Sequence, residues 1–185
     1  AGRAAADAFL AAHAGDIGWN WNAVRPVVEE LDLHYIRSAP WFSWWETNND
    51  NADPWVTNWS AFGEPNDFYH WHDLPMARYF DNRGIEVSHG IWGGGDWLYL
   101  SGSSEVDPAK YDELGESIAS YNHAMRDDGV TVSYAEVQNE PALGKYDDPY
   151  ALRDAGLEVI AQFDHHGMHD VMFHGPNFHR PRDTA

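Results

Sequence analysis

The sequence predicts an α/β fold built on a parallel sheet, and three features of its 185 residues indicate this. Short apolar runs of strand type alternate with longer segments whose apolar residues recur at helical spacing. Asp-Pro pairs and glycines stand at the boundaries between these segments. Hydrophobic residues make up 43% of the chain, enough for one packed domain over residues 1–185. Alternating helices and strands favour a parallel sheet with right-handed crossovers.

The first half of the chain predicts two helix–strand pairs. Asn22–Leu31 carries valines and a leucine at helical spacing, and a short strand over Leu33–Ser38 follows it. Asp73 is expected to cap a helix that runs to about Asn82, because a proline stands in its first turn. The strand Ile85–Ile91 comes after this helix.

The clearest predicted helix lies at the centre of the chain. Asp107 is its expected N-cap, and Pro108 takes the first helical position. Its apolar stripe consists of Tyr111, Leu114, Ile118, Tyr121 and Met125. Gly129 ends the helix, and Val130–Val137 is predicted to be a strand.

The last predicted helix begins with the same device, Asp148 followed by Pro149. The residues expected to face inward are Leu152, Ala155, Val159, Ile160 and Phe163. Gly167 stops this helix, and a final strand is expected over Asp170–His174.

Polar and aromatic residues follow each predicted strand, which favours a barrel over an open doubly wound sheet. They are Arg37 with Trp41, His89 with Trp92, Asn139 with Glu140, and His174 with Asn177. Barrels carry their chemistry at these carboxyl ends of strands, and no glycine-rich phosphate turn leads into a helix. A full barrel takes about 250 residues and eight strands. The sequence therefore predicts a partial (β/α)₈ (TIM) barrel with about strands 1 or 2 to 5, the others being expected after residue 185.

The net charge of the chain limits the kinds of molecule that it can bind. Eleven basic residues, of which two are lysines, stand against 30 acidic ones, giving a net charge of −19. This charge opposes nucleic-acid binding, and no apolar run reaches the roughly 18 residues of a membrane span. An acidic chain almost without lysine is typical of a salt-loving organism, the alternative being an ordinary acidic secreted enzyme. No signal peptide is visible, and an extracellular location is favoured over a cytoplasmic one. Oligomeric state is open.

The most specific segment is Tyr134–Pro141. It places a carboxylic acid, Glu140, beside an amide, Asn139, at the end of a predicted strand and before a rigid proline. Such an acid can protonate a leaving oxygen while the amide binds a hydroxyl group of the substrate. The alternative is a polar turn in which the carboxylate is simply solvated.

Asn139-Glu140-Pro141 resembles the Asn-Glu-Pro that ends the fourth strand in clan A of the glycoside hydrolases, retaining (β/α)₈ enzymes that include families five and thirty. The resemblance implies that Glu140 is the acid/base and that Asn139 contacts the sugar 2-hydroxyl. It further implies that Arg37 holds the nucleophile ionised and that His89 faces the substrate. The clan's nucleophile, a glutamate ending the seventh strand, is absent from this chain, so the chain alone is expected to be inactive. Glu136 is expected to be a structural partner.

Aromatic and histidine residues complete the expected site. Trp41 and Trp92 are predicted to stack on sugar rings, and His174 to line the cleft. No cofactor and no metal ligand are expected. Two other functions remain open. One is a non-catalytic carbohydrate-binding domain using the same aromatics. The other is a metal-dependent hydrolase using histidine clusters such as His165 with His169.

Overall fold

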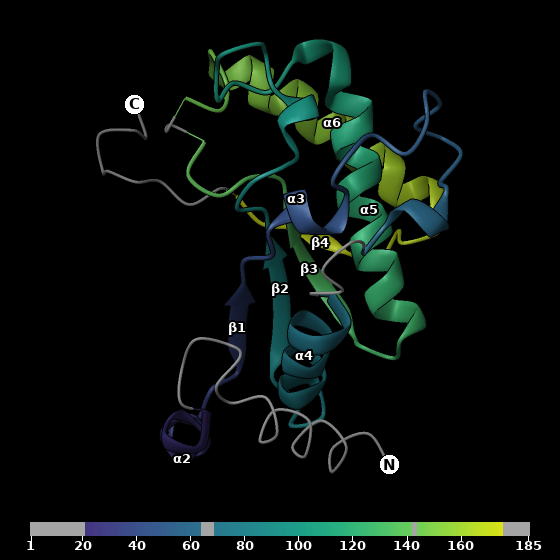
Figure 1. The fold of residues 1–185 in the computed structure, drawn as a ribbon. Helices are drawn as coiled ribbons and strands as arrows, with labels where there is room; N and C mark the ends of the chain where they lie inside the picture. The colour runs from purple at the N-terminus through teal and green to yellow at the C-terminus, as the bar shows by residue number, and fades with distance from the viewer. Residues whose placement is uncertain (1–20, 64–68, 142–143, 176–185) are drawn as a thin grey trace.

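The computed structural model describes residues 21–63, 69–141 and 144–175, and its centre is a four-stranded parallel sheet (Figure 1). The strands lie in the order β1 (Tyr35–Ser38), β2 (Glu86–Gly90), β3 (Val132–Glu136) and β4 (Met172–Phe173), each parallel to its neighbour. The predicted α/β class with a parallel sheet is confirmed. The additional strand considered near the N-terminus lies outside the described residues.

Helices alternate with these strands. They are α2 (Trp21–Glu30), α3 (Phe42–Trp45), α4 (Leu74–Asp81), α5 (Tyr111–Asp127) and α6 (Pro149–His165). Three 3₁₀ turns cover Trp59–Ala61, Asp96–Leu98 and Pro108–Lys110, and a π-helical turn covers Tyr69–Asp73. Helix α4 packs on β2, α5 packs on β3, and α6 packs along α5. None of the described helices is long and apolar enough to cross a membrane.

Two of the predicted caps form and one does not. The Asp107 side chain accepts a hydrogen bond from the Ala109 N–H and so begins the 3₁₀ turn that leads into α5. Asp148 accepts from the N–H groups of the second and third residues of α6. Asp73 does not cap α4, because the preceding π-helical turn already gives it helical dihedrals. Its carboxylate instead accepts from the Tyr121 hydroxyl.

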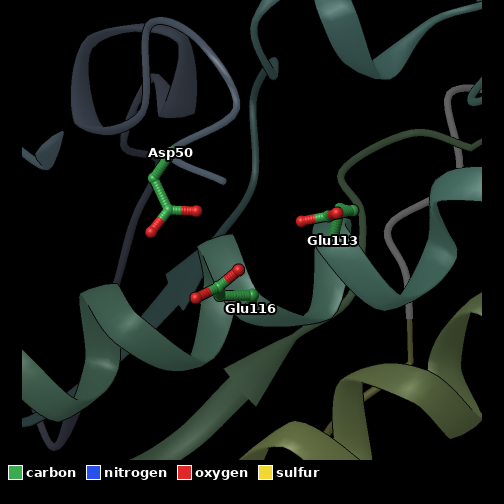
Figure 2. Close-up of side chains that lie close together, drawn as sticks. All are labelled: Asp50, Glu113 and Glu116. Atoms are coloured by element: carbon green, nitrogen blue, oxygen red, sulfur yellow. The ribbon is translucent and has the colours of Figure 1, made fainter. Parts of the chain in front are cut away.

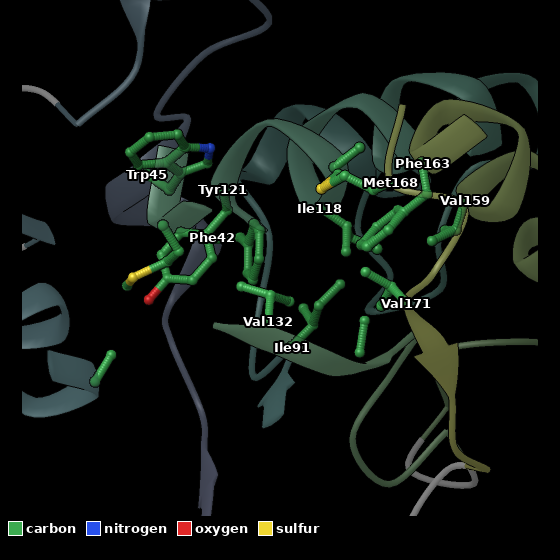
Figure 3. Close-up of a cluster of buried hydrophobic side chains, with 14 of the residues drawn as sticks. Phe42, Trp45, Ile91, Ile118, Tyr121, Val132, Val159, Phe163, Met168 and Val171 are labelled. Carbon is green, nitrogen blue, oxygen red and sulfur yellow. The ribbon is translucent and has the colours of Figure 1, made fainter. Parts of the chain in front are cut away.

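The hydrophobic core fills the space between the sheet and helices α4–α6 (Figure 3). The predicted stripe of α5 lies inside it, with Ile118 and Met125 fully buried. Within α6, Ala155, Val159 and Phe163 are buried as expected. Ile160 is a correction, since 41% of it is exposed and its side chain lies beyond the edge of the buried face.

Alternation along the strands gives the sheet two faces, and this decides which residues are available for chemistry. Val87 and Ala135 point toward the helices and are buried in the core. In each strand, the residues that alternate with these point to the opposite face of the sheet, which is the inner face in a barrel. Arg37 pairs with Ser88 in the register, and Gly90 pairs with Glu136. Both levels come after the register shift between Val87 and Ser88 in the pairing of β2 with β3.

Candidate active site

The loops that follow the first three strands are joined by backbone hydrogen bonds. The Trp92 N–H donates to the Pro40 carbonyl at 3.2 Å, and the Asn139 N–H donates to the Ile91 carbonyl at 3.0 Å. The Ser43 N–H also donates to the Gly93 carbonyl at 3.1 Å. These bonds hold the segments after β1, β2 and β3 together at the carboxyl edge of the sheet, where the sequence predicted the site.

Arg37 of β1 links the neighbouring strand ends on the inner face. Its Nε donates to Glu136 Oε2 at 2.7 Å, and one terminal nitrogen lies 2.5 Å from the same oxygen. That nitrogen also donates to Asn139 Oδ1 at 2.9 Å. Glu136 is fully buried, so the guanidinium supplies the counter-charge that an ionised carboxylate needs there. Arg37 thereby orients the amide next to the candidate acid.

Gly90 makes room for this ion pair. A Cβ atom at this position would lie 2.1 Å from Glu136 Oε2 and 2.5 Å from an Arg37 terminal nitrogen. Such contacts are far inside van der Waals distance. A side chain at the end of β2 would therefore displace the ion pair that crosses above the strand.

Glu140 has an unusual backbone conformation. Its φ is +46°, the only positive value at a non-glycine residue in the described part of the chain. Residues before a proline ordinarily adopt extended dihedrals, so Pro141 makes this conformation less common still. Backbone strain of this kind concentrates at functional sites, where the surrounding structure maintains it. The Asn139 Nδ2 lies 3.4 Å from Glu140 Oε2.

Three tryptophans form an exposed cluster on the loops after β1 and β2. Trp41 stacks on Trp44 with ring centroids 6.1 Å apart, and Trp92 meets Trp41 edge to face at 5.6 Å. All three side chains remain more than a third exposed to solvent. The cluster offers apolar ring faces at the same edge of the sheet as Asn139, and a sugar presents apolar C–H faces that such rings cover.

His89 is a correction. It was expected to face the substrate, yet it is 2% exposed and lies on the helix side of the sheet. Its Nδ1 forms a hydrogen bond with Ser38 Oγ at 2.7 Å, and its ring contacts Tyr121 of α5. Burial lowers the pKa of His89 to about 4, so the ring is neutral at pH 7. Its place is structural, between β2 and α5.

His174 lies on the inner face, at the level of Ser88. Its Nδ1 lies 3.2 Å from the Gly175 carbonyl, which can only accept, so Nδ1 carries the proton. Nε2 then accepts from the Ser88 hydroxyl at 2.5 Å and from the Tyr35 hydroxyl at 3.2 Å. This places His174 on the same sheet face as Arg37, and its role in lining a cleft stays a prediction. Asn177, expected beside it, lies outside the described residues.

Sequence reasoning missed Tyr35 and Ser88 as members of this face, along with Tyr134, whose ring meets that of Tyr35 at 6.0 Å. The signal was present in the sequence. Each of these residues lies two positions before Arg37, Gly90 or Glu136 in its strand, and residues two apart share a face.

The histidine clusters gather no metal site within the described residues. His169 Nδ1 forms a hydrogen bond with Asp164 at 2.8 Å, and both side chains are largely exposed. The one group of three or more ligand-type residues with close side-chain atoms in that part of the chain contains no histidine. The proposed histidine-based hydrolase therefore lacks a geometric basis there.

No family model matches the sequence, and no curated protein matches it. Solved structures do resemble it. One is the endo-β1,6-glucanase BT3312, with a TM-score of 0.57 and 16% identity over 76% of this chain and 34% of that one. Another is Xyn30A from Clostridium acetobutylicum, a xylanase of glycoside hydrolase family 30 subfamily 8, with a TM-score of 0.51 and 15% identity over 75% and 33%. The chain thus spans about a third of the length of these enzymes. At such identities the likeness concerns the fold alone, and it supports a sheet of the glycoside hydrolase barrel type, distantly and in part.

Proposed function

We propose that this chain is part of a retaining glycoside hydrolase acting on β-linked oligo- or polysaccharide. Glu140 would act as the proton donor and then as the base. The observation that carries the proposal is the strained backbone of Glu140 at the carboxyl edge of a parallel sheet, next to an amide held by Arg37. The fold likeness to two glycoside hydrolases supports the same reading.

Each neighbouring group has a role in this mechanism. Asn139 would bind the hydroxyl beside the reacting carbon, since Arg37 fixes its Oδ1 and leaves Nδ2 as the hydrogen-bond donor. Trp41 and Trp92 would cover the apolar faces of sugar rings in the adjoining subsites. Arg37 acts through Glu136 and Asn139, and is therefore a positioning residue.

The retaining reaction needs a second carboxylate as nucleophile, about 5–5.5 Å from the acid. Glu136 does not suit this role, because it is fully buried and paired with Arg37. By the resemblance, the nucleophile belongs to the seventh strand of the barrel, and four strands are described here. We therefore propose turnover only for a protein that contains this chain together with the seventh strand and its nucleophile.

The test compares Glu140→Gln with Glu86→Gln, an exposed glutamate at the amino end of β2. Removing a general acid is expected to lower turnover of alkyl β-glycosides by about 10²–10⁴-fold. Dinitrophenyl glycosides, whose leaving group needs little protonation, should lose far less in the first step. Full activity of Glu140→Gln on alkyl glycosides would refute the assignment.

A second candidate, a non-catalytic carbohydrate-binding domain, is favoured by the exposed tryptophan cluster itself. Binding of β-linked glucan and xylan oligosaccharides, measured by calorimetry, separates the two. Both candidates predict weaker binding for Trp41→Ala and Trp92→Ala and no change for Trp55→Ala, an exposed tryptophan that contacts His165 instead. Only the enzyme predicts that Glu140→Gln abolishes turnover while binding persists.

A further inference from the structure

Three carboxylates converge between α5 and the loop that follows α3 (Figure 2). Glu113 and Glu116 stand three residues apart on the first turns of α5, so they share one side of the helix. Asp50 faces them from the loop. One oxygen of each carboxylate lies within 4.8 Å of one oxygen of each of the other two.

Glu113 and Glu116 are buried, Asp50 is partly buried, and none of the three has a compensating charge in the described part of the chain. Glu116 is completely buried, and neither of its oxygens makes a hydrogen bond of ordinary geometry. Glu113, which is 8% exposed, has one buried oxygen without a hydrogen-bond partner, and Asp50 also has one. Among the residues that the structure describes, no arginine or lysine forms an ion pair with any of them. An ionised carboxylate buried without a counter-charge is strongly unfavourable.

A fourth carboxyl group lies beside the three. Glu46, almost fully buried, accepts hydrogen bonds from the Ser117 hydroxyl and from the Asp50 N–H. Either protons or a cation must neutralise the group.

The loop holds Asp50 with one oxygen turned toward the cluster. Its Oδ2 accepts from the Asn58 N–H at 2.6 Å and from the Asn51 side-chain amide at 2.9 Å. These two bonds fix the carboxylate of Asp50 and leave its buried Oδ1 as the oxygen without a partner. Such an arrangement suits a bound cation better than a shared proton, because the carboxylate oxygens already surround one point.

We propose that Asp50, Glu113 and Glu116 bind one divalent cation, calcium in preference to magnesium. Hard cations take oxygen ligands, and three carboxylate oxygens that all lie within 4.8 Å of one another can reach a single ion. Calcium accepts six to eight oxygens in flexible geometry and is commonly held by several protein carboxylates. Magnesium demands near-ideal octahedral geometry and usually keeps several waters with only one or two carboxylates, so a site with three protein carboxylates favours calcium.

The bound ion fastens the loop over residues 46–58 to α5. This loop continues directly from α3, the helix that carries Trp44 and follows Trp41. We therefore assign the ion a structural role, in which it fixes the segment of the chain that follows the tryptophan-bearing helix α3. The site stands independently of the proposed glycosidase activity, and it departs from the expectation that the chain has no metal ligands.

The test is calcium titration of the chelator-treated chain by calorimetry, with terbium luminescence as a second probe. Trp97 can sensitise terbium, because its indole N–H donates to the carbonyl of Glu46 beside the cluster. The wild-type chain should bind one calcium ion and melt at a higher temperature with calcium than without it. Glu116→Gln should weaken binding at least tenfold and remove most of the thermal shift.

Asp127→Asn is the matched control, an exposed carboxylate at the far end of α5, and it should bind calcium as the wild type does. If Glu116→Gln fails to fold, Glu113→Gln replaces it and should likewise weaken calcium binding and reduce the thermal shift. Absence of stoichiometric calcium binding in the wild type overturns the proposal, as does unchanged affinity in both glutamine variants. Tighter binding of magnesium than of calcium overturns the preference for calcium.

Discussion

Removing the Arg37 guanidinium tests whether one ion pair organises the strand ends. At 2.7 Å and an effective dielectric constant of about 20, the gross attraction between Arg37 and Glu136 is about 6 kcal/mol. Desolvation offsets part of it, and the Arg37 side chain keeps 23% of its surface exposed. Breaking a buried pair nevertheless leaves an unpaired charge, so Arg37→Met should lower the free energy of unfolding by about 3–5 kcal/mol.

A double-mutant cycle isolates the pair from other losses. Glu136→Met alone leaves Arg37 facing an apolar side chain, whereas the double variant Arg37→Met with Glu136→Met buries no unpaired charge. The double variant should therefore be much less destabilised than the sum of the two singles, with a coupling energy of about 3 kcal/mol.

The assay is urea unfolding at pH 7, followed by tryptophan fluorescence. Arg153→Met is the control, since its pair with Asp154 lies at 2.5 Å but has both side chains more than half exposed, and it should change stability by less than about 1 kcal/mol. A coupling energy below about 1 kcal/mol, or an Arg37→Met variant as stable as Arg153→Met, would refute the reasoning.

Three further predictions follow from packing, protonation and charge. Gly90→Ala should lower the free energy of unfolding by about 1–3 kcal/mol, because its Cβ meets the Glu136 carboxylate, whereas Gly175→Ala, with open space at its Cβ, should be neutral. His89 has a folded-state pKa near 4, below its unfolded value of about 6.5, so its contribution is present above pH 6.5 and is lost as the pH falls toward 4. Wild type should lose up to about 3 kcal/mol over that window relative to His89→Asn, measured by unfolding at each pH, and parallel curves would contradict it. With a net charge of −19, the chain should melt at a higher temperature in molar salt than in dilute buffer, and equal melting temperatures would exclude the salt-loving interpretation.

Local signals in the sequence were enough to predict the four longer helices and the parallel sheet, but not the short helix α3. Asp107 and Asp148 begin helices because a short acceptor followed by proline satisfies the first free N–H groups. The strands were predicted too long, β1 at its first end only and the other three at both ends. β4, for example, covers Met172–Phe173 where Asp170–His174 was expected, because ladder pairing rather than strand propensity sets its limits.

The face of His89 could have been predicted but was not. Ile85, Val87 and Ile91 have the same parity as His89 and are the apolar residues of that strand, which assigns His89 to the core side. Its position at a strand end, together with the resemblance, led to the opposite expectation.

The acidic cluster could not have been predicted from local pattern. Asp50 and Glu113 are 63 positions apart (113 − 50), and Asp50 lies in a loop with no regular structure. Only the path of that loop across α5 brings the carboxylates together, and no periodicity in the sequence records that path.

On the proposed function, the left-handed backbone of Glu140 sets a trade-off between stability and activity at one position. Glycine would adopt this conformation without the penalty of about 1–2 kcal/mol that an L-side chain meets there. A chain selected for stability alone would thus prefer glycine at position 140, and would give up the acid by doing so. Glutamate at this position costs folding stability, and the proposed role of Glu140 as general acid would explain why it is kept.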